Sequence, residues 1–214
     1  WNPGNPELMK NQVINRGIVQ SNGQLLFGTQ LYGIHVFDSA GNLLFSMDQH
    51  NGMQNNTILG LYEDDQGYIW AGLDNGIDLI DLKSRISFYR DTEGTIGAVY
   101  SLLFTDEFIF AATNKGVFYS KLERGATSGI LHLDFTLLPG SESQAWSLES
   151  LDDQIFCGHN DGTYEIQDLK FEQVSPVAGG YSICRIRYSE SPLLLQGTYT
   201  DLVLYRKESG KWVY

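Results

Sequence analysis

Short apolar runs separated by polar turns recur along the whole chain. The clearest copy spans residues 56–81, where an apolar run leads to the turn Asp65-Gln66-Gly67 and then to an aromatic run that ends at Gly72. A short polar loop, Gly76 and another apolar run complete this copy. Runs of this length bounded by glycine and polar residues are typical of β-strands joined by tight turns. No window of twelve or more residues keeps a period of 3.6 residues, so the chain is predicted to be all-β.

The same order of elements returns about every forty residues. The small residue that closes the second strand of each copy stands at positions 28, 72, 112, 158 and 197, so successive copies are 39–46 residues apart. The turn residue before that strand lies five positions ahead in the first four copies and six in the last. A period in the low forties is that of a β-propeller blade. Constant length inside the hairpin favours a repeated sheet whose inner strands pack between neighbours.

The repeat predicts an all-β fold, a β-propeller of four-stranded antiparallel blades. We expect one partial propeller over residues 1–214, with about five blades at 11–50, 51–95, 96–142, 143–180 and 181–214. Their fourth strands are expected at 43–45, 86–89, 131–135, 171–174 and 211–214, where apolar and polar residues alternate. A β-sandwich is the alternative, but it gives no reason to repeat one four-strand pattern at this interval.

The charge balance limits the classes of partner. The chain has 14 Lys and Arg against 26 Asp and Glu, a formal charge of −12. Nucleic-acid binding needs clustered cations, so a nucleic-acid partner is not expected. A strongly anionic ligand is disfavoured as well, unless a local arginine pocket overrides the net field. The acidity is interpreted as a means of keeping an aromatic-rich surface soluble.

The cysteines and histidines show no pattern of a metal or cofactor site. Cys157 and Cys184 stand inside apolar runs and are expected to be buried free thiols, although a bridge between adjacent blades stays open if the compartment is oxidising. The four histidines, at positions 35, 50, 132 and 159, lack metal-ligand spacing and are interpreted as turn or surface residues. We therefore expect no metal, no cofactor and no catalytic residues.

The loops between the second and third strands hold the candidate ligand-binding residues. In propellers these loops share one face with the connections between blades. Their amides, hydroxyls and aromatic rings suit a neutral sugar, because amides bind hydroxyl groups and rings stack on the apolar face of a pyranose. The candidates are Tyr32, Asp74, Asn75, Asn114, His159, Asn160, Asp161 and Tyr199. Ordinary solvated loops are the alternative interpretation.

The segment from Asp65 to Ile77 resembles the two-component regulator propeller repeat. That repeat has the signature D-x-G-x-[IL]-W-[IVA]-G-T-x-x-G-[IL], and the segment departs from it only at Leu73, where the family has threonine. The other copies are degenerate but keep the Gly-Thr step or the closing glycine. The same Asp65-x-Gly67-x-x-Trp70 stretch resembles the Asp-box of sialidases, which is a folding turn.

The resemblance implies a role in signalling. Such repeats build the periplasmic sensor region of hybrid two-component sensor histidine kinases, which precedes a membrane helix and a kinase core. No His-box or nucleotide-binding motif is present, so this chain is not expected to be an enzyme. A periplasmic sensor fragment that recognises a small ligand, an oligosaccharide, is the leading hypothesis. The chain starts at Trp1 rather than Met, which indicates a piece excised from a longer protein.

Two further expectations and two alternatives go with this hypothesis. Sensors of this kind have about seven blades per ring, so five blades would leave an incomplete ring with exposed blade faces. We therefore expect a homodimer or other self-association through those faces. One alternative is a structural or dimerisation propeller without its own ligand site. The other is a propeller enzyme, either sialidase-like or a lyase with His159 beside Asp161 as a weak candidate.

Overall fold

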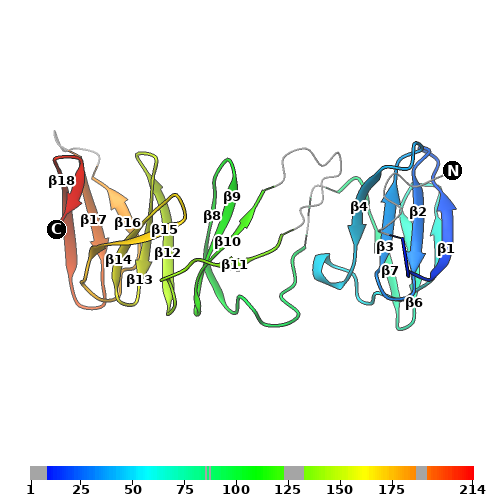
Figure 1. Cartoon of the computed structure of the whole chain (residues 1–214), viewed down its shortest axis with the longest axis horizontal. Coiled ribbons are helices and arrows are strands. Elements are labelled where there is room, and N and C mark those ends of the chain that lie inside the picture. The colour runs from blue at the N-terminus through cyan, green and yellow to red at the C-terminus, as the bar shows by residue number, and fades with distance from the viewer. Residues whose placement is uncertain (1–8, 85, 87, 123–132, 187–191) are drawn as a thin grey trace. The chain divides into compact units, whose positions relative to one another are not determined.

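The computed structural model describes residues 9–84, 86, 88–122, 133–186 and 192–214. These residues form two compact units, each of which is described by itself. Unit 1 comprises the described residues up to 93, coloured blue to cyan in Figure 1. Unit 2 comprises the described residues of 94–122 and 133–214, coloured green to red. The only helix in the described part of the chain is a short 3-10 turn, η1 (Gln49–Asn51).

Unit 1 contains two antiparallel sheets. The first has the order β1-β2-β3-β4 and the second the order β5-β6-β7. The strands of the first sheet are β1 (Ile14–Val19), β2 (Leu25–Thr29), β3 (Ile34–Phe37) and β4 (Leu43–Met47). Those of the second are β5 (Ile58–Glu63), β6 (Ile69–Leu73) and β7 (Ile77–Ile80).

Unit 2 contains three antiparallel sheets of four strands. The first, in the order β11-β10-β9-β8, consists of β8 (Val99–Phe104), β9 (Phe108–Thr113), β10 (Gly116–Lys121) and β11 (Thr136–Leu137). The second consists of β12 (Ala145–Leu151), β13 (Gln154–His159), β14 (Gly162–Gln167) and β15 (Lys170–Ser175). The third consists of β16 (Ile183–Arg185), β17 (Leu193–Gly197), β18 (Leu202–Glu208) and β19 (Lys211–Val213).

Neighbouring sheets within a unit pack face to face, as propeller blades do. In unit 1, Leu26 and Ile34 of the first sheet share an apolar core with Ile58 and Ile69 of the second. In unit 2, Phe110 of β9 and Leu148 of β12 belong to one core. The first strands β8, β12 and β16 contact one another, whereas the fourth strands β15 and β19 barely touch. The sheets therefore fan outward from their first strands, and the prediction of an all-β fold with propeller blades is confirmed.

The outer strands differ from the prediction in two sheets. The third sheet takes its fourth strand from Thr136–Leu137 rather than from 131–135, of which 131 and 132 lie outside the described residues. Residues 86, 88 and 89 are not in a strand, and residue 87 of that expected strand also lies outside the described residues. Ile86 and Phe88 are exposed. Outer strands have only one neighbour in the sheet, so the apolar pattern alone does not fix where they pair.

Asp64, one position before the aspartate of the sequence signature, holds the turn of the clearest repeat. The side chain of Asp64 accepts hydrogen bonds from the backbone N–H groups of Gln66 and Tyr68, each at 3.0 Å, and from the Trp70 indole N–H at 2.9 Å. The Trp70 hydrogen bond is the largest of the causes that lower the pKa of Asp64. Asp65, the aspartate of the sequence signature, is exposed. Gly67 completes the turn at φ = 84°, a conformation that glycine adopts most readily.

Both cysteines are free, and only one is buried. Cys157 lies in the core between the first two sheets of unit 2, where burial raises the pKa of its thiol. Cys184 is exposed on β16, so the expectation of two buried thiols is wrong for this residue. The strand that carries Cys184 is only three residues long, Ile183–Arg185, and Ile183 takes the buried position instead.

Candidate functional site

The first strands of four sheets carry an irregularity opposite the small residue that closes the second strand. The register shifts there in four sheets, opposite Gly28, Gly72, Ala112 and Gly158. In the fourth sheet Ala145 pairs with His159 and Ser147 pairs with Gly158, so Trp146 is the extra residue. A β-bulge of this kind leaves one residue unpaired and re-aims its side chain.

The residue left out of the register is called here the bulge residue of its sheet. The bulge residues are Asn15, Leu59, Tyr100 and Trp146 in the first four sheets. In the fifth sheet Gly197 faces two residues in the same way, because its carbonyl accepts from the Tyr181 N–H at 2.8 Å and its N–H donates to Ser182 at 3.3 Å. Tyr181 therefore occupies the corresponding position.

The three bulge residues of unit 2 are aromatic and lie side by side. The ring centroids of Tyr100 and Trp146 are 5.0 Å apart, with the ring planes tilted by 34°. Those of Trp146 and Tyr181 are 5.4 Å apart, tilted by 42°. Tyr100 is 45% exposed and Tyr181 is 42% exposed. Together with the partly buried Trp146 they form a row of rings at the beginning of the three sheets, which we call the aromatic row.

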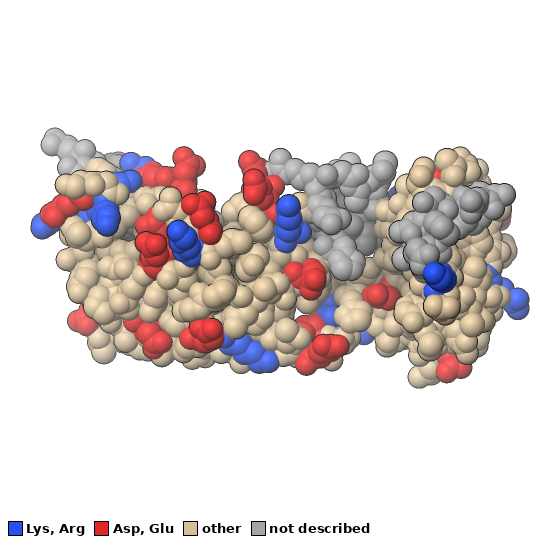
Figure 2. Space-filling view, viewed as in Figure 1, with Lys and Arg blue, Asp and Glu red and all other residues tan. Residues whose placement is uncertain are grey.

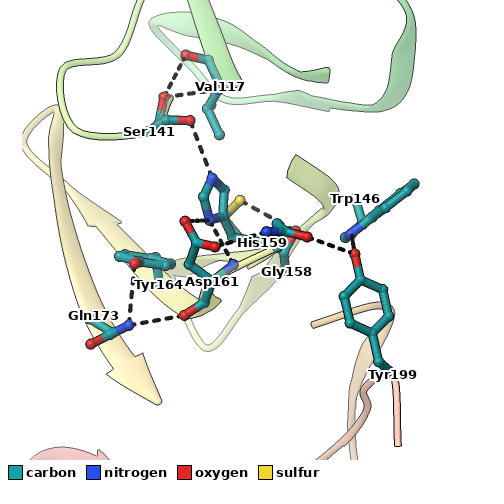
Figure 3. A network of polar contacts seen from close by, with 11 residues as sticks. Val117, Ser141, Trp146, Gly158, His159, Asp161, Tyr164, Gln173 and Tyr199 are labelled. Carbon is teal, nitrogen blue, oxygen red and sulfur yellow. Dashed lines mark hydrogen bonds and ion pairs between the residues drawn. The ribbon is translucent and has the colours of Figure 1, made fainter. Parts of the chain in front are cut away.

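Tyr199, from the loop between β17 and β18, joins the aromatic row from the side. Its ring packs edge-on against Tyr181, at a centroid distance of 5.5 Å and an interplanar angle of 74°. Its hydroxyl accepts from the Trp146 indole N–H at 3.0 Å and donates to the Asn160 side-chain oxygen at 2.9 Å. Asn160 in turn donates to the Asp161 carboxylate at 2.8 Å. Figure 3 shows how Trp146, Tyr199 and Asp161 are linked through this chain of contacts.

The segment between the fourth and fifth sheets, which carries Tyr181, packs closely against both sheets. The Tyr181 carbonyl accepts a hydrogen bond from the Ser147 hydroxyl at 2.7 Å and one from the Gln196 side-chain amide at 3.3 Å. A Cβ atom at Gly158 would lie 2.1 Å from the carbonyl oxygen of Gly180. A Cβ atom at Gly179 would lie 2.1 Å from the ring of Tyr199. Both glycines are therefore needed for Tyr181 and Tyr199 to approach Trp146 as closely as they do.

His159 supports the site from inside the protein. It is 1% exposed, its Nε2 lies 3.3 Å from the Ser141 carbonyl, and its Nδ1 accepts from the Asp161 backbone N–H at 3.2 Å. These partners place the ring proton on Nε2, where it is donated to Ser141. The ring also packs edge-on against Tyr164, at 5.2 Å. His159 thus fixes the turn that presents Asn160 and Asp161 (Figure 3).

The interpretation of the histidines as turn or surface residues is wrong for two of them. His35 is 3% exposed and lies between Ser46 and Gln12, at 2.7 Å and 2.8 Å, and His159 is buried as described above. Both stand on inner strands, where an imidazole with two hydrogen-bond partners is tolerated inside a core. His50 is exposed, and His132 lies outside the described residues.

The buried histidines predict that stability falls in mildly acidic solution. Burial, the largest cause, lowers the pKa of both His35 and His159; Asp48 opposes it at His35, and Ser141 and Asp161 oppose it at His159. The unfolded chain therefore binds protons near pH 6.5 that the folded chain does not. We expect the free energy of unfolding to have its full value above pH 7, where both histidines are neutral in the folded and the unfolded chain. It should decrease as the pH falls below about 6.5.

Urea unfolding at pH 7.5 and pH 5.5 measures this loss of stability. His159→Gln should reduce the difference between the two pH values, because it removes one of the two groups. His50→Gln, at an exposed position, serves as the control and should leave the difference unchanged. An equal pH dependence in the wild-type chain and the His159→Gln variant would contradict the prediction.

The structure gathers half of the predicted site residues. His159, Asn160, Asp161 and Tyr199 lie together in unit 2, with the last three at the surface. Asn114 lies in another loop of unit 2, where its side-chain oxygen accepts from the Ala98 N–H at 2.8 Å. The remaining candidates, Tyr32, Asp74 and Asn75, are exposed loop residues of unit 1.

Sequence reasoning missed the aromatic row itself. Tyr100 and Trp146 stand near the start of first strands and Tyr181 lies just before one, so none of them is in a loop between second and third strands. Gln144, whose side-chain amide donates to the Tyr100 hydroxyl at 3.3 Å, was missed as well. A signal was present, because Tyr100 and Trp146 each precede the small residue of their repeat by twelve positions. Aligning the repeats on that residue would have placed the two rings at one structural position.

Among the described residues, no three His, Cys, Asp or Glu side chains are grouped as metal ligands. The His159 ring is buried, so it cannot reach a substrate as the lyase alternative requires. On the side shown in Figure 2, acidic and basic side chains of unit 2 are interspersed between large uncharged areas. The described residues as a whole contain no helix that is long and apolar enough to span a membrane.

Comparison with known proteins supports the repeat and the fold. Residues 52–75 match the family model described as "Two component regulator propeller". The extracellular domain of BT3049 from B. thetaiotaomicron, described as a hybrid two component system, superposes with a TM-score of 0.59 at 16% identity, over 94% of this chain and 28% of that one. No match was found among curated proteins.

Two other solved structures are similar at lower scores. The extracellular domain of BT4673 from B. thetaiotaomicron, also described as a hybrid two component system, gives a TM-score of 0.41 at 19% identity, over 95% of this chain and 31% of that one. The computationally designed Ika8 protein gives 0.40 at 16% identity, over 94% of this chain and 60% of that one. The chain thus spans less than a third of the length of both bacterial domains. It has a β-propeller fold, and residues 52–75 match the repeat described as "Two component regulator propeller".

Proposed function

We propose that the chain is a ligand-sensing part of the periplasmic region of a two-component sensor. The repeat at residues 52–75 supports this role, since its family is described as a regulator propeller. The fold likeness to an extracellular domain of a two component system supports a location outside the cytoplasm. In this proposal the chain binds the signal, and a kinase elsewhere in the polypeptide acts on it.

The ligand we propose is a neutral oligosaccharide bound at the aromatic row. The observation that carries this proposal is a set of three adjacent rings beside amide and carboxylate groups. Tyr100 and Tyr181 are exposed, and Trp146 is partly buried in contact with both. Aromatic faces pack on the C–H face of a pyranose, while amides and carboxylates bind its hydroxyl groups. The Asp161 side chain is 59% exposed and can accept from a sugar hydroxyl.

A thermal-shift titration of the full 214-residue chain tests the proposal. The panel consists of neutral cello-, xylo-, manno- and malto-oligosaccharides, with oligogalacturonides as the acidic comparison. A ligand that binds only the native state raises the melting temperature. At a ligand concentration of about a hundred times Kd, it raises the free energy of unfolding by about 2.7 kcal/mol. The neutral sugars are expected to raise it and the acidic ones to leave it unchanged.

Two variants locate the binding. Tyr199→Phe removes the hydroxyl that joins Trp146 to Asn160 and should weaken binding. Tyr32→Phe changes an exposed loop tyrosine of unit 1 and should not. A panel without any response, or equal effects of the two variants, would argue against the aromatic row as the sensing site.

Self-association through an open blade face is a second candidate role. Leu202 and Leu204 of β18 are 75% and 49% exposed, while Val203 and Tyr205, which alternate with them, are buried in a core. Light scattering on the titrated samples distinguishes the two roles. A dimer whose amount does not change with sugar supports the structural alternative, and a monomer that binds sugar supports the sensor.

A further inference from the structure

The bulge residues allow the ligand to be specified further, on the assumption that the proposed function is right. The fold places one bulge residue at the same point of every sheet, so five residues can be compared in one environment. In unit 1 they are Asn15 and Leu59, and in unit 2 they are Tyr100, Trp146 and Tyr181. Asn15 makes a local contact, since its side-chain amide donates to the Ile58 carbonyl at 3.0 Å.

The comparison shows that the blade does not require an aromatic bulge residue. Sheets with Asn15 or Leu59 have the same register shift opposite a glycine as the sheet with Trp146. Leu59 is 48% exposed, as much as Tyr100 and Tyr181, so the position contributes little to a core. Large aromatic side chains stand at this position in three consecutive sheets, and two of them, Tyr100 and Tyr181, are exposed while Trp146 is only partly buried. We therefore assign them a role other than folding.

The polar groups that hold the aromatic row lie at its flanks rather than over it. The Trp146 indole N–H is bound by the Tyr199 hydroxyl on one side, and Gln144 binds the Tyr100 hydroxyl on the other. These contacts fix the orientation of the rings and satisfy their polar atoms. Rings oriented in advance lose little conformational entropy when a ligand binds, which favours stacking on their exposed surfaces.

We infer that the aromatic row is an extended binding site with one sugar subsite per blade, and that its ligand is a linear neutral oligosaccharide of at least three units. The row runs across three sheets, and a single pyranose covers only one or two of its rings. A chain that passes from Tyr100 over Trp146 to Tyr181 makes one stacking contact at each blade. The polar flanks, Gln144 at one end and Asn160 with Asp161 at the other, then bind the hydroxyl groups of the terminal units.

Chain-length series test this inference. The probes are cello-, xylo- and manno-oligosaccharides of one to six units, titrated into the full chain by calorimetry. For the series that binds, each added unit up to three or four should raise affinity about 3- to 10-fold, and longer chains should add nothing. A monosaccharide that binds as tightly as the tetramer overturns the inference but leaves the proposed function standing. Failure of every series to bind counts against both.

Alanine variants map the subsites. Trp146→Ala removes the central ring and should lower affinity for the tetramer by roughly 30-fold or more. Tyr100→Ala removes an end ring and should make the affinity of the trimer equal to that of the dimer. Leu59→Ala, at the matching position of unit 1, is the control and should change neither. Equal losses in all three variants, or an unchanged length dependence in Tyr100→Ala, would overturn the inference.

Discussion

Gly158→Ala is expected to destabilise unit 2 by about 3 kcal/mol. The added Cβ would lie 2.1 Å from the Gly180 carbonyl oxygen and 2.6 Å from that of Tyr181. These are backbone atoms, so a side-chain rotation cannot relieve the clash. The segment between the fourth and fifth sheets would have to move away, taking Tyr181 out of the aromatic row.

Gly197→Ala is the matched control for this variant. Gly197 closes the second strand of the fifth sheet, as Gly158 does in the fourth, yet a Cβ there would meet no atom within 4 Å. Its replacement should change stability by less than about 0.5 kcal/mol. Urea unfolding, monitored by hydrogen exchange in peptides from residues 145–214, measures the free energy of unfolding of unit 2 by itself. Equal stability of the two alanine variants would show that the close approach at Gly158 is not required.

Gln196→Leu is expected to cost about 1–3 kcal/mol, because it removes a buried acceptor shared by two hydroxyl groups. The Tyr205 hydroxyl keeps Thr163 Oγ1 as an acceptor at 3.1 Å, but the Thr163 hydroxyl loses the Gln196 oxygen to which it donates. Gln196 is fully buried, and its side-chain oxygen accepts from the Tyr205 hydroxyl at 2.7 Å and from the Thr163 hydroxyl. Thr163 belongs to the fourth sheet, and the other two residues belong to the fifth. The contact therefore joins two blades, and its loss should loosen the fifth sheet first.

Tyr205→Phe separates the loss of one hydrogen bond from the loss of the whole contact. It removes only one donor, and Gln196 keeps its bond from Thr163, so the expected cost is about 1 kcal/mol. Hydrogen exchange in β17 and β18 should increase strongly in Gln196→Leu and only slightly in Tyr205→Phe. A Gln196→Leu variant as stable as the wild-type chain would show that apolar packing, and not this contact, holds the last blade.

The buried positions of the inner strands follow directly from the sequence pattern. The runs ending at positions 28, 72, 112, 158 and 197 all form second strands, and the loops searched for ligand-binding residues do join second and third strands. These strands have partners on both sides and a neighbouring sheet on each face or on one. The apolar pattern, strand length and turn glycines therefore all indicate the same arrangement.

The outer strands and single side chains were less predictable. Thr136–Leu137 pairs with β10 instead of the more apolar run before it, because the long connection leaves several registers available. The pattern also could not tell that Asp64 rather than Asp65 binds the Trp70 indole. Adjacent aspartates in a turn have the same local propensity, and only the direction of each side chain separates them.

The sequence by itself determined the repeat, its four-stranded sheet, the position of its small residues and the likeness of its clearest copy to the two-component regulator propeller repeat. It did so because strand, turn and period are local properties that neighbouring residues specify. The tertiary structure alone decided which side chains meet. Tyr100, Trp146, Tyr181 and Tyr199 come from different sheets and loops, and the bulge that aims the first three toward one another exists only once the strands are paired.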